Sequence, residues 1–578
     1  MNKPYQISIA GVVVVLMTAC GLSQEETTVT SNPQPVNESE TPAQAPSPRK
    51  TAADRVPGPG QKNRNIPAIS HAASQVLSKK EGRVRPLKME STALLHQPPR
   101  TEPQDRENYQ HLVDNAVHIV RDDPVSTFSM DVDTGAYANM RRFLNQGQLP
   151  PKNAIRIEEL VNYFSYDYPQ PADGQHPFSI TTEISTTPWN PDTYLLHVGI
   201  QGYDQPTAEL PPANLVFLID VSGSMRDNNK LPLLKSAMKM MVKRLRSPDR
   251  VSIIVYAGAS GVVLEPTAGN EKFKINAALD LLYAGGSTNG AAGIRLAYAL
   301  AQQTFIPDGI NRVILATDGD FNVGTVNFDS LKQMIEDRRQ SGIALSTLGF
   351  GTGNYNEQLM EQLADAGNGN YAYIDNINEA RKALVDEMSS TLFTIAHDAK
   401  IQVEFNPGTV AEYRLIGYSN RLLQKEDFNN DKVDAGDIGA GHSVTALYEI
   451  ALVDSTGVKN SSLRYKPENE TVGNGTAINL EELALLRIRY KEKSSAASRL
   501  IEQPLSVSSI QSRMTETSNN YRFAAAVAAF GQILRGGKHM SNYTITESIQ
   551  LARMATGPDE FGYRGEFVRM AGLANALM

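Results

Sequence analysis

Three oxygen-bearing side chains stand within five positions directly after an apolar run. The run "NLVFLI" ends in Asp220, and Ser222 and Ser224 follow at alternate positions with Gly223 between them. The alternation directs the three side chains to one side, and Gly223 lets the loop turn tightly. A plain turn does not need a carboxylate and two hydroxyls, so this spacing indicates a site that binds a ligand or an ion.

Two later loops offer matching groups. "GGSTNG" contains Thr288, and "ATDGD", at the end of another apolar run, contains Asp318. Together with Asp220, Ser222 and Ser224 they form a set of two carboxylates and three hydroxyls. Hard oxygen ligands of this kind suit Mg²⁺ or Mn²⁺ at near-octahedral geometry, with water completing the shell.

The elements that must position these loops alternate along residues 213–395. Continuous apolar runs such as 214–219 are typical of parallel strands covered on both faces. Amphipathic stretches between them, such as the one carrying Leu234, Met238, Met241 and Leu245 on one face, predict helices. Alternating strands and helices predict a doubly wound, mostly parallel α/β sheet, in which ligands bind at the carboxyl ends of the strands.

These motifs, in this order on this kind of sheet, resemble the von Willebrand factor A domain and its metal-ion-dependent adhesion site. The resemblance implies that Ser222, Ser224 and Thr288 bind the metal directly or through water. It implies that Asp220 and Asp318 act mostly through water. The alternative is a degenerate site whose oxygens only cap helices and turns.

The chain has one cysteine, and it follows an apolar stretch at the N-terminus. "MNKPYQISIAGVVVVLMTAC" has a positive start at Lys3, apolar residues from Ile7 to Met17, and small residues before Cys20. This is a secretory signal pattern, and it resembles a bacterial lipobox in which Cys20 becomes the lipidated first residue. The alternative is an ordinary signal peptide with Cys20 incidental. The resemblance implies a Gram-negative cell envelope, with outer-membrane sorting suggested by Gly21.

Residues 21–107 are rich in Pro, Ser, Thr, Gln and Glu, which predicts a disordered tether. The 578-residue chain is 41% hydrophobic with a formal net charge of −8, and no region is overwhelmingly basic. Nucleic acid is therefore not an expected partner.

A second motif, Asp131-Val132-Asp133-Thr134, follows a short apolar run. It resembles the nucleophile loop of haloacid dehalogenase phosphatases, in which the first Asp attacks phosphorus and the second acts as acid or base. No later lysine and acidic-pair motifs follow in order. The alternative is an Asp-rich turn that caps a helix beginning near Ala136.

Strand-like segments on both sides of residues 213–395 predict a β-sandwich into which the α/β domain is inserted, followed by C-terminal helices, the first of which is rich in Ala and aromatic residues and is expected to be buried. The acidic loop 427–437 is either a surface loop or a weak cation site, because it lacks the spacing of an EF-hand. The predicted organisation is a signal peptide at 1–20, a tether at 21–107, an N-terminal α+β segment at 108–212, the A domain at 213–395, and a C-terminal β-sandwich with helices at 396–578.

The order of lipobox, linker, "STFSMDVDTGAYANMRRFLNQGQLPP", A domain and "YRLIGYSNRLLQKEDFNNDKVDAGDIGAGH" resembles the bacterial YfbK-type lipoproteins. We therefore expect a lipid-anchored envelope protein that is not an enzyme. We expect it to bind a protein partner that offers an acidic residue to the metal. The alternative is a metal-dependent hydrolase or phosphatase that uses Asp131 and Asp133.

Overall fold

The computed structural model describes residues 107–111, 113–130, 133–172, 174–286, 290–319, 328–353, 355–460, 479–494 and 496–578. The described residues fall within one compact unit, His96–Met578. The predicted signal peptide and nearly all of the predicted tether lie outside the described residues. Among the described residues, the structure contains no helix with the length and apolarity needed to cross a bilayer.

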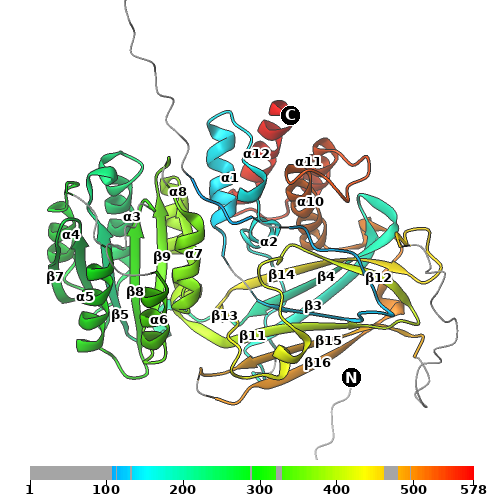
Figure 1. Ribbon diagram of the computed structural model, residues 1–578, viewed down its shortest axis with the longest axis horizontal. Helices are drawn as coiled ribbons and strands as arrows, with labels where there is room; N and C mark the ends of the chain where they lie inside the picture. The colour runs from blue at the N-terminus through cyan, green and yellow to red at the C-terminus, as the bar shows by residue number, and fades with distance from the viewer. Residues whose placement is uncertain are drawn as a thin grey trace, which may run out of the picture. The chain divides into compact units, whose positions relative to one another are not determined.

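A six-stranded sheet forms the α/β domain, in the order β10–β9–β8–β5–β6–β7 (Figure 1). Its strands are β5 (Ala213–Asp220), β6 (Arg250–Tyr256), β7 (Ser260–Ala268), β8 (Ile310–Thr317), β9 (Ala344–Phe350) and β10 (Tyr371–Ile374). All neighbouring pairs are parallel except β6 and β7. The predicted mostly parallel sheet is confirmed.

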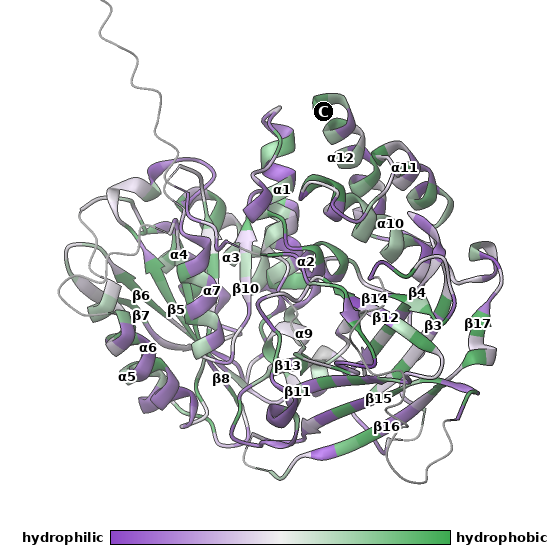
Figure 2. Ribbon diagram, turned by 45° about the vertical axis from the view of Figure 1, so that its right-hand side comes forward, coloured by the Kyte–Doolittle hydropathy of each residue, from purple (hydrophilic) through white to green (hydrophobic). Residues whose placement is uncertain are grey.

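Helices cover both faces of this sheet. They are α3 (Leu231–Arg244), α4 (Lys272–Asp280), α5 (Gly290–Gln303), α6 (Phe328–Arg339), α7 (Glu357–Ala366), α8 (Ile377–Arg381) and α9 (Met388–Leu392). Leu215, Phe217 and Ile219 of β5 pack into a core with α3 and α4. Val216 and Leu218 pack into a second core with α5, α6 and α7. The apolar run is continuous because both faces of β5 are buried (Figure 2).

Strands from both sides of the α/β domain join in shared sheets. One sheet has the order β1–β12–β14–β4–β3–β17, and the other has the order β13–β11–β15–β16 with β2 also paired to β11. The strands are β1 (His118–Ile119), β2 (Val125–Ser129), β3 (Phe178–Thr187), β4 (Asn190–Gly202), β11 (Thr394–Phe405), β12 (Val410–Ile416), β13 (Gly436–Gly439), β14 (Ser443–Leu452), β15 (Glu482–Lys491), β16 (Arg499–Ser506) and β17 (Ile510–Gln511). One core contains residues of both sheets, which places the α/β domain as an insertion within the β-rich part.

The helical part consists of α1 (Gly135–Asn145), α2 (Ile157–Asn162), α10 (Asn519–Leu534), α11 (Ile545–Met554) and α12 (Tyr563–Leu577). Helix α10 begins at a Ser518 cap, and α11 begins at a Thr544 and Glu547 capping box. The alanine-rich α10 is buried along almost its whole length, as its composition predicted. Its core includes Leu195 and Leu447, so these helices cover the outer face of the sheet that contains β4 and β14.

Buried ion pairs join the α/β domain to the helical part. Arg156, which precedes α2, donates to the carboxylate of Glu361 on α7 at 2.5 Å. Arg141 on α1 pairs with Glu379 on α8 at 2.7 Å. A buried charge that loses its partner is strongly destabilising. These contacts therefore fix the position of α1 and α2 against the carboxyl end of the α/β sheet.

Candidate functional site

Asp220 is the last residue of β5 and is completely buried. Its Oδ1 accepts a hydrogen bond from the Ser222 N–H at 2.8 Å. Its Oδ2 accepts from the Thr317 hydroxyl at 2.9 Å and from the Tyr256 hydroxyl at 3.2 Å. The carboxylate therefore holds the loop in shape and ties β5 to the ends of β6 and β8.

Ser222 and Ser224 converge as their spacing predicted. Their hydroxyl oxygens lie 2.9 Å apart, and Ser222 is buried. The Gly223 N–H donates to the carbonyl of Gly286 at 3.1 Å, and the Gly285 N–H donates to the carbonyl of Val221 at 2.7 Å. These bonds hold the segment that leads to Thr288 against the serine loop. Thr288 itself lies outside the described residues.

Asp318 follows β8 and is also completely buried. Because β5 and β8 are parallel neighbours, with Ile219 opposite Ala316, Asp318 stands at the same edge as Asp220. Gly319 then adopts φ +84°, and a Cβ there would meet the backbone nitrogen of Asn356 at 2.6 Å. Only glycine allows the chain to leave the strand here.

Lys230 is a member of this site that the sequence interpretation missed. It precedes α3, is buried, and its Nζ donates to Oδ2 of Asp318 at 2.9 Å. The only signal in the sequence was a lysine at the start of a helix, which is ordinarily a solvated residue. The structure thus places one positive charge among the predicted metal ligands.

The two buried carboxylates at this edge act on each other electrostatically. Burial raises the pKa of Asp220, and the charge of Asp318 raises it further, while the Ser222 N–H opposes the rise. Two carboxylates near each other, with two converging hydroxyls, form a hard oxygen set that fits Mg²⁺ or Mn²⁺. Within the described ranges there is no group of three or more His, Cys, Asp or Glu that could hold a metal. A site built from two acids and several hydroxyls does not need such a group.

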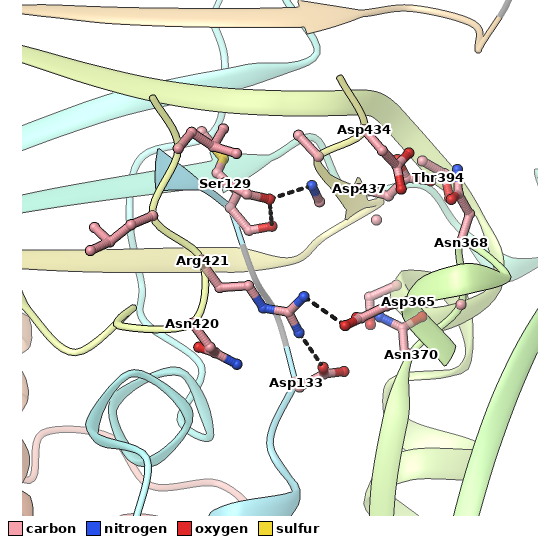
Figure 3. A pocket seen from close by; sticks show the side chains of 18 residues that line it. Ser129, Asp133, Asp365, Asn368, Asn370, Thr394, Asn420, Arg421, Asp434 and Asp437 are labelled. Carbon is pink, nitrogen blue, oxygen red and sulfur yellow. Dashed lines mark hydrogen bonds and ion pairs between the residues drawn. The ribbon is translucent and has the colours of Figure 1, made fainter. Parts of the chain in front are cut away.

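The other predicted motif lies at a separate cavity of roughly 220 Å³ between the α/β domain and the β-sandwich (Figure 3). Asp133 lines it, but its Oδ1 accepts from the Tyr371 N–H at 2.8 Å and its Oδ2 accepts from Arg421 at 3.2 Å. Arg421 also bridges to Asp365 at 2.9 Å. Asp133 thus connects β10 to the segment after β12, which is a structural role. Asp131 lies outside the described residues.

The acids of the loop 427–437 are dispersed among different partners. Asp431 accepts from the Ser498 N–H, Asp434 pairs with Arg339 at 2.7 Å, and Asp437 pairs with His397 at 3.0 Å. This arrangement supports the interpretation as a surface loop.

Known protein families match most of the described chain. The family described as "Uncharacterized protein YfbK, C-terminal" matches residues 390–577, "von Willebrand factor" matches residues 103–197, and "von Willebrand factor type A domain" matches residues 214–387. The uncharacterized protein YfbK of Escherichia coli K12 is 48% identical over 477 residues, which are 81% of each chain.

More distant relatives share parts of the chain. Inter-alpha-trypsin inhibitor heavy chain H2 of Mesocricetus auratus is 28% identical over 148 residues, which are 24% of this chain and 16% of that protein. The solved structure of a von Willebrand factor type A protein from Catenulispora acidiphila is 14% identical, with a TM-score of 0.38, and the match covers 69% of this chain and 90% of that one. Domains of this type generally mediate protein–protein interaction, which supports an adhesion or scaffold role.

Proposed function

Since the chain belongs to the YfbK family of bacterial von Willebrand factor A domain proteins, we propose that it is a lipid-anchored cell-envelope protein that grips a protein partner through a divalent metal ion. The ion would be Mg²⁺ or Mn²⁺. Its ligands, direct or through water, would be Asp220, Ser222, Ser224, Thr288 and Asp318.

This proposal rests mainly on the convergence of the two serine hydroxyls, whose oxygens lie 2.9 Å apart. They lie at the edge of the sheet where the adjacent strands β5 and β8 lead to Asp220 and Asp318. Side chains that only capped turns would point to separate backbone groups. Lys230 already compensates one negative charge at Asp318. A divalent ion would compensate both carboxylates at once.

The partner is expected to supply a carboxylate. With these protein oxygens and waters as ligands, the ion would be able to accept one further ligand from outside. Hydroxyl ligands leave the ion more electrophilic than a cage of carboxylates would, so an incoming Asp or Glu gains more. The domain family supports protein binding in general, and we propose that in this chain the binding depends on the metal ion.

Calorimetric titration of the protein with Mg²⁺ and Mn²⁺ tests the site directly. Ser222→Ala and Ser224→Ala are the best variants, because Asp220 and Asp318 also hold the fold through Tyr256, Thr317 and Lys230. Each variant should bind the metal at least about tenfold more weakly, a loss of ~1.4 kcal/mol. Ser236→Ala, at an exposed serine of α3, is the matched control. Equal affinity in all three variants and the parent would reject the site.

Partner capture in intact cells tests the role of the metal. Crosslinked partners should be recovered in Mg²⁺ and lost in EDTA, and Ser224→Ala should reduce their recovery. If the same partner is recovered equally in both conditions, the protein is a scaffold that binds through another face.

The proposal of a lipid anchor is supported only by the sequence around Cys20. A cysteine that carries several acyl chains would hold a protein firmly at a membrane, because each buried CH₂ contributes about 0.8 kcal/mol. The proposed location is the outer membrane of a Gram-negative bacterium, on either its periplasmic or its outer surface.

A further inference from the structure

The three most exposed large hydrophobic side chains among the described residues lie within one short segment. Phe273 is 89% exposed, Tyr283 is 79% exposed and Leu281 is 73% exposed. Phe273 is in α4, and the other two directly follow it. Single exposed hydrophobic residues are ordinary on protein surfaces, but a cluster of this kind marks an interaction surface.

Helix α4 is apolar on two opposite sides. Ile275, Ala278 and Leu279 are buried in the core beneath the sheet. Phe273, Ala277 and Leu281 are exposed and recur every fourth residue, which places them along one stripe on the opposite side. The buried side packs the helix against the core, and the outer stripe faces solvent.

Lysines flank this stripe. Lys272 and Lys274 stand on either side of Phe273 in the sequence. Lys235, Lys239 and Lys243 form a row along α3, and this row runs beside α4. Lys235 donates to the carbonyls of Asp280 and Leu282, Lys239 pairs with Asp280, and Lys272 donates to the carbonyl of Lys243.

The charge of this face is opposite to that of the whole chain. The five lysines lie among two acids of α4 and its N-cap, Glu271 and Asp280, whereas the protein carries a formal net charge of −8. The face lies at the β7 end of the sheet, remote from the β-sandwich (Figure 1). Protruding aromatic and aliphatic side chains ringed by lysines have the composition of helices that lie in the surface of a bilayer.

We propose that this face, formed by α4, the residues up to Tyr283 and the lysine row of α3, docks on an anionic phospholipid bilayer. Phe273, Leu281 and Tyr283 enter the interfacial region, and the lysines contact the headgroups while their aliphatic stems lie along the apolar stripe. The proposal depends neither on the lipid anchor nor on a metal ion. It would hold the α/β domain at a membrane surface in a fixed orientation.

Vesicle sedimentation with the compact unit, residues 96–578, tests the proposal, since the hydrophobic cores formed by the described residues all lie inside this unit. The unit should bind vesicles of phosphatidylcholine and phosphatidylglycerol, and bind pure phosphatidylcholine at least about tenfold more weakly. Phe273→Ser with Tyr283→Ser should weaken binding to the anionic vesicles about tenfold or more. Phe561→Ser, at an aromatic side chain 49% exposed elsewhere, should not change it.

A fluorescence reporter separates insertion from simple charge attraction. The protein has a single tryptophan, Trp189, which is buried and should be insensitive to vesicles. In Phe273→Trp, the added emission should shift to the blue on anionic vesicles. Failure to bind either kind of vesicle overturns the proposal and leaves a protein as the occupant of this face. Binding without a blue shift, or binding unaffected by the Phe273 and Tyr283 substitutions, also overturns it.

Discussion

Replacement of Lys230 by methionine tests whether its positive charge stabilises the buried Asp318 at the candidate metal site. Lys230 is 5% exposed, Asp318 is completely buried, and their charged atoms lie 2.9 Å apart. Removal of one member of such a pair leaves a buried charge uncompensated, which costs about 3–5 kcal/mol. In EDTA, Lys230→Met should therefore destabilise the α/β sheet by this amount.

Mg²⁺ should reverse much of this loss. A ligand at one hundred times its dissociation constant stabilises the folded state by about 2.7 kcal/mol. In the parent the ion must compete with the ammonium group for Asp318, whereas in the variant it does not. We expect the variant to bind Mg²⁺ at least about tenfold more tightly than the parent, a difference of ~1.4 kcal/mol.

Amide hydrogen exchange on β5 and β8 is the appropriate assay, because a chain with several cores does not unfold in one step. Lys239→Met is the matched control, since that lysine lies on the same helix in an exposed pair with Asp280 and should change stability by less than about 1 kcal/mol. Two results would refute the reasoning. One is an opening free energy of Lys230→Met in EDTA that differs from that of the parent by less than about 1 kcal/mol, the size expected for an exposed ion pair. The other is stronger stabilisation of the parent than of the variant by Mg²⁺.

Three further predictions concern other parts of the chain. Burial raises the pKa of Glu357 from 4.5 to about 8. The protonated carboxyl therefore contributes its full stability to the fold below pH 4.5, and this contribution is lost as the pH rises toward 8. Glu357→Gln should thus gain stability relative to the parent across this range, and melting curves with parallel pH profiles would contradict this. Cys20→Ser should release the protein from membranes. A variant that resists carbonate extraction as the parent does would contradict this prediction. Asp133→Asn should lower the melting temperature by weakening the contact to Arg421, and neither parent nor variant should hydrolyse p-nitrophenyl phosphate.

The sequence was sufficient to predict most of the central sheet and the loops that meet at its carboxyl edge. Alternation of apolar runs with amphipathic helices is a local signal, and parallel strands buried on both faces give it strongly. Asp220, Ser222 and Ser224 are close in sequence, so their convergence follows from the geometry of one loop. The position of Asp318 beside them follows from the rule that parallel strands end at one edge.

One strand of the α/β sheet was not predicted. β7 pairs with β6 in an antiparallel register interrupted by irregularities, and few of its residues are buried. A strand of this kind shows neither a continuous apolar run nor regular alternation. Its pairing depends on the β6 edge, which exists only after the sheet has formed.

The tertiary structure alone decided which charges meet across long distances in the chain. Lys230 and Asp318 are 88 positions apart, and Asp133 and Arg421 are 288 positions apart. An isolated lysine or aspartate has no pattern that predicts its partner, because ion pairing depends on position in space and not on periodicity. The sequence therefore determined the α/β fold and the oxygen-rich loops. Packing decided that a lysine shares the site, that Asp133 holds two parts of the fold together, and that Phe273, Leu281 and Tyr283 remain exposed beside a row of lysines.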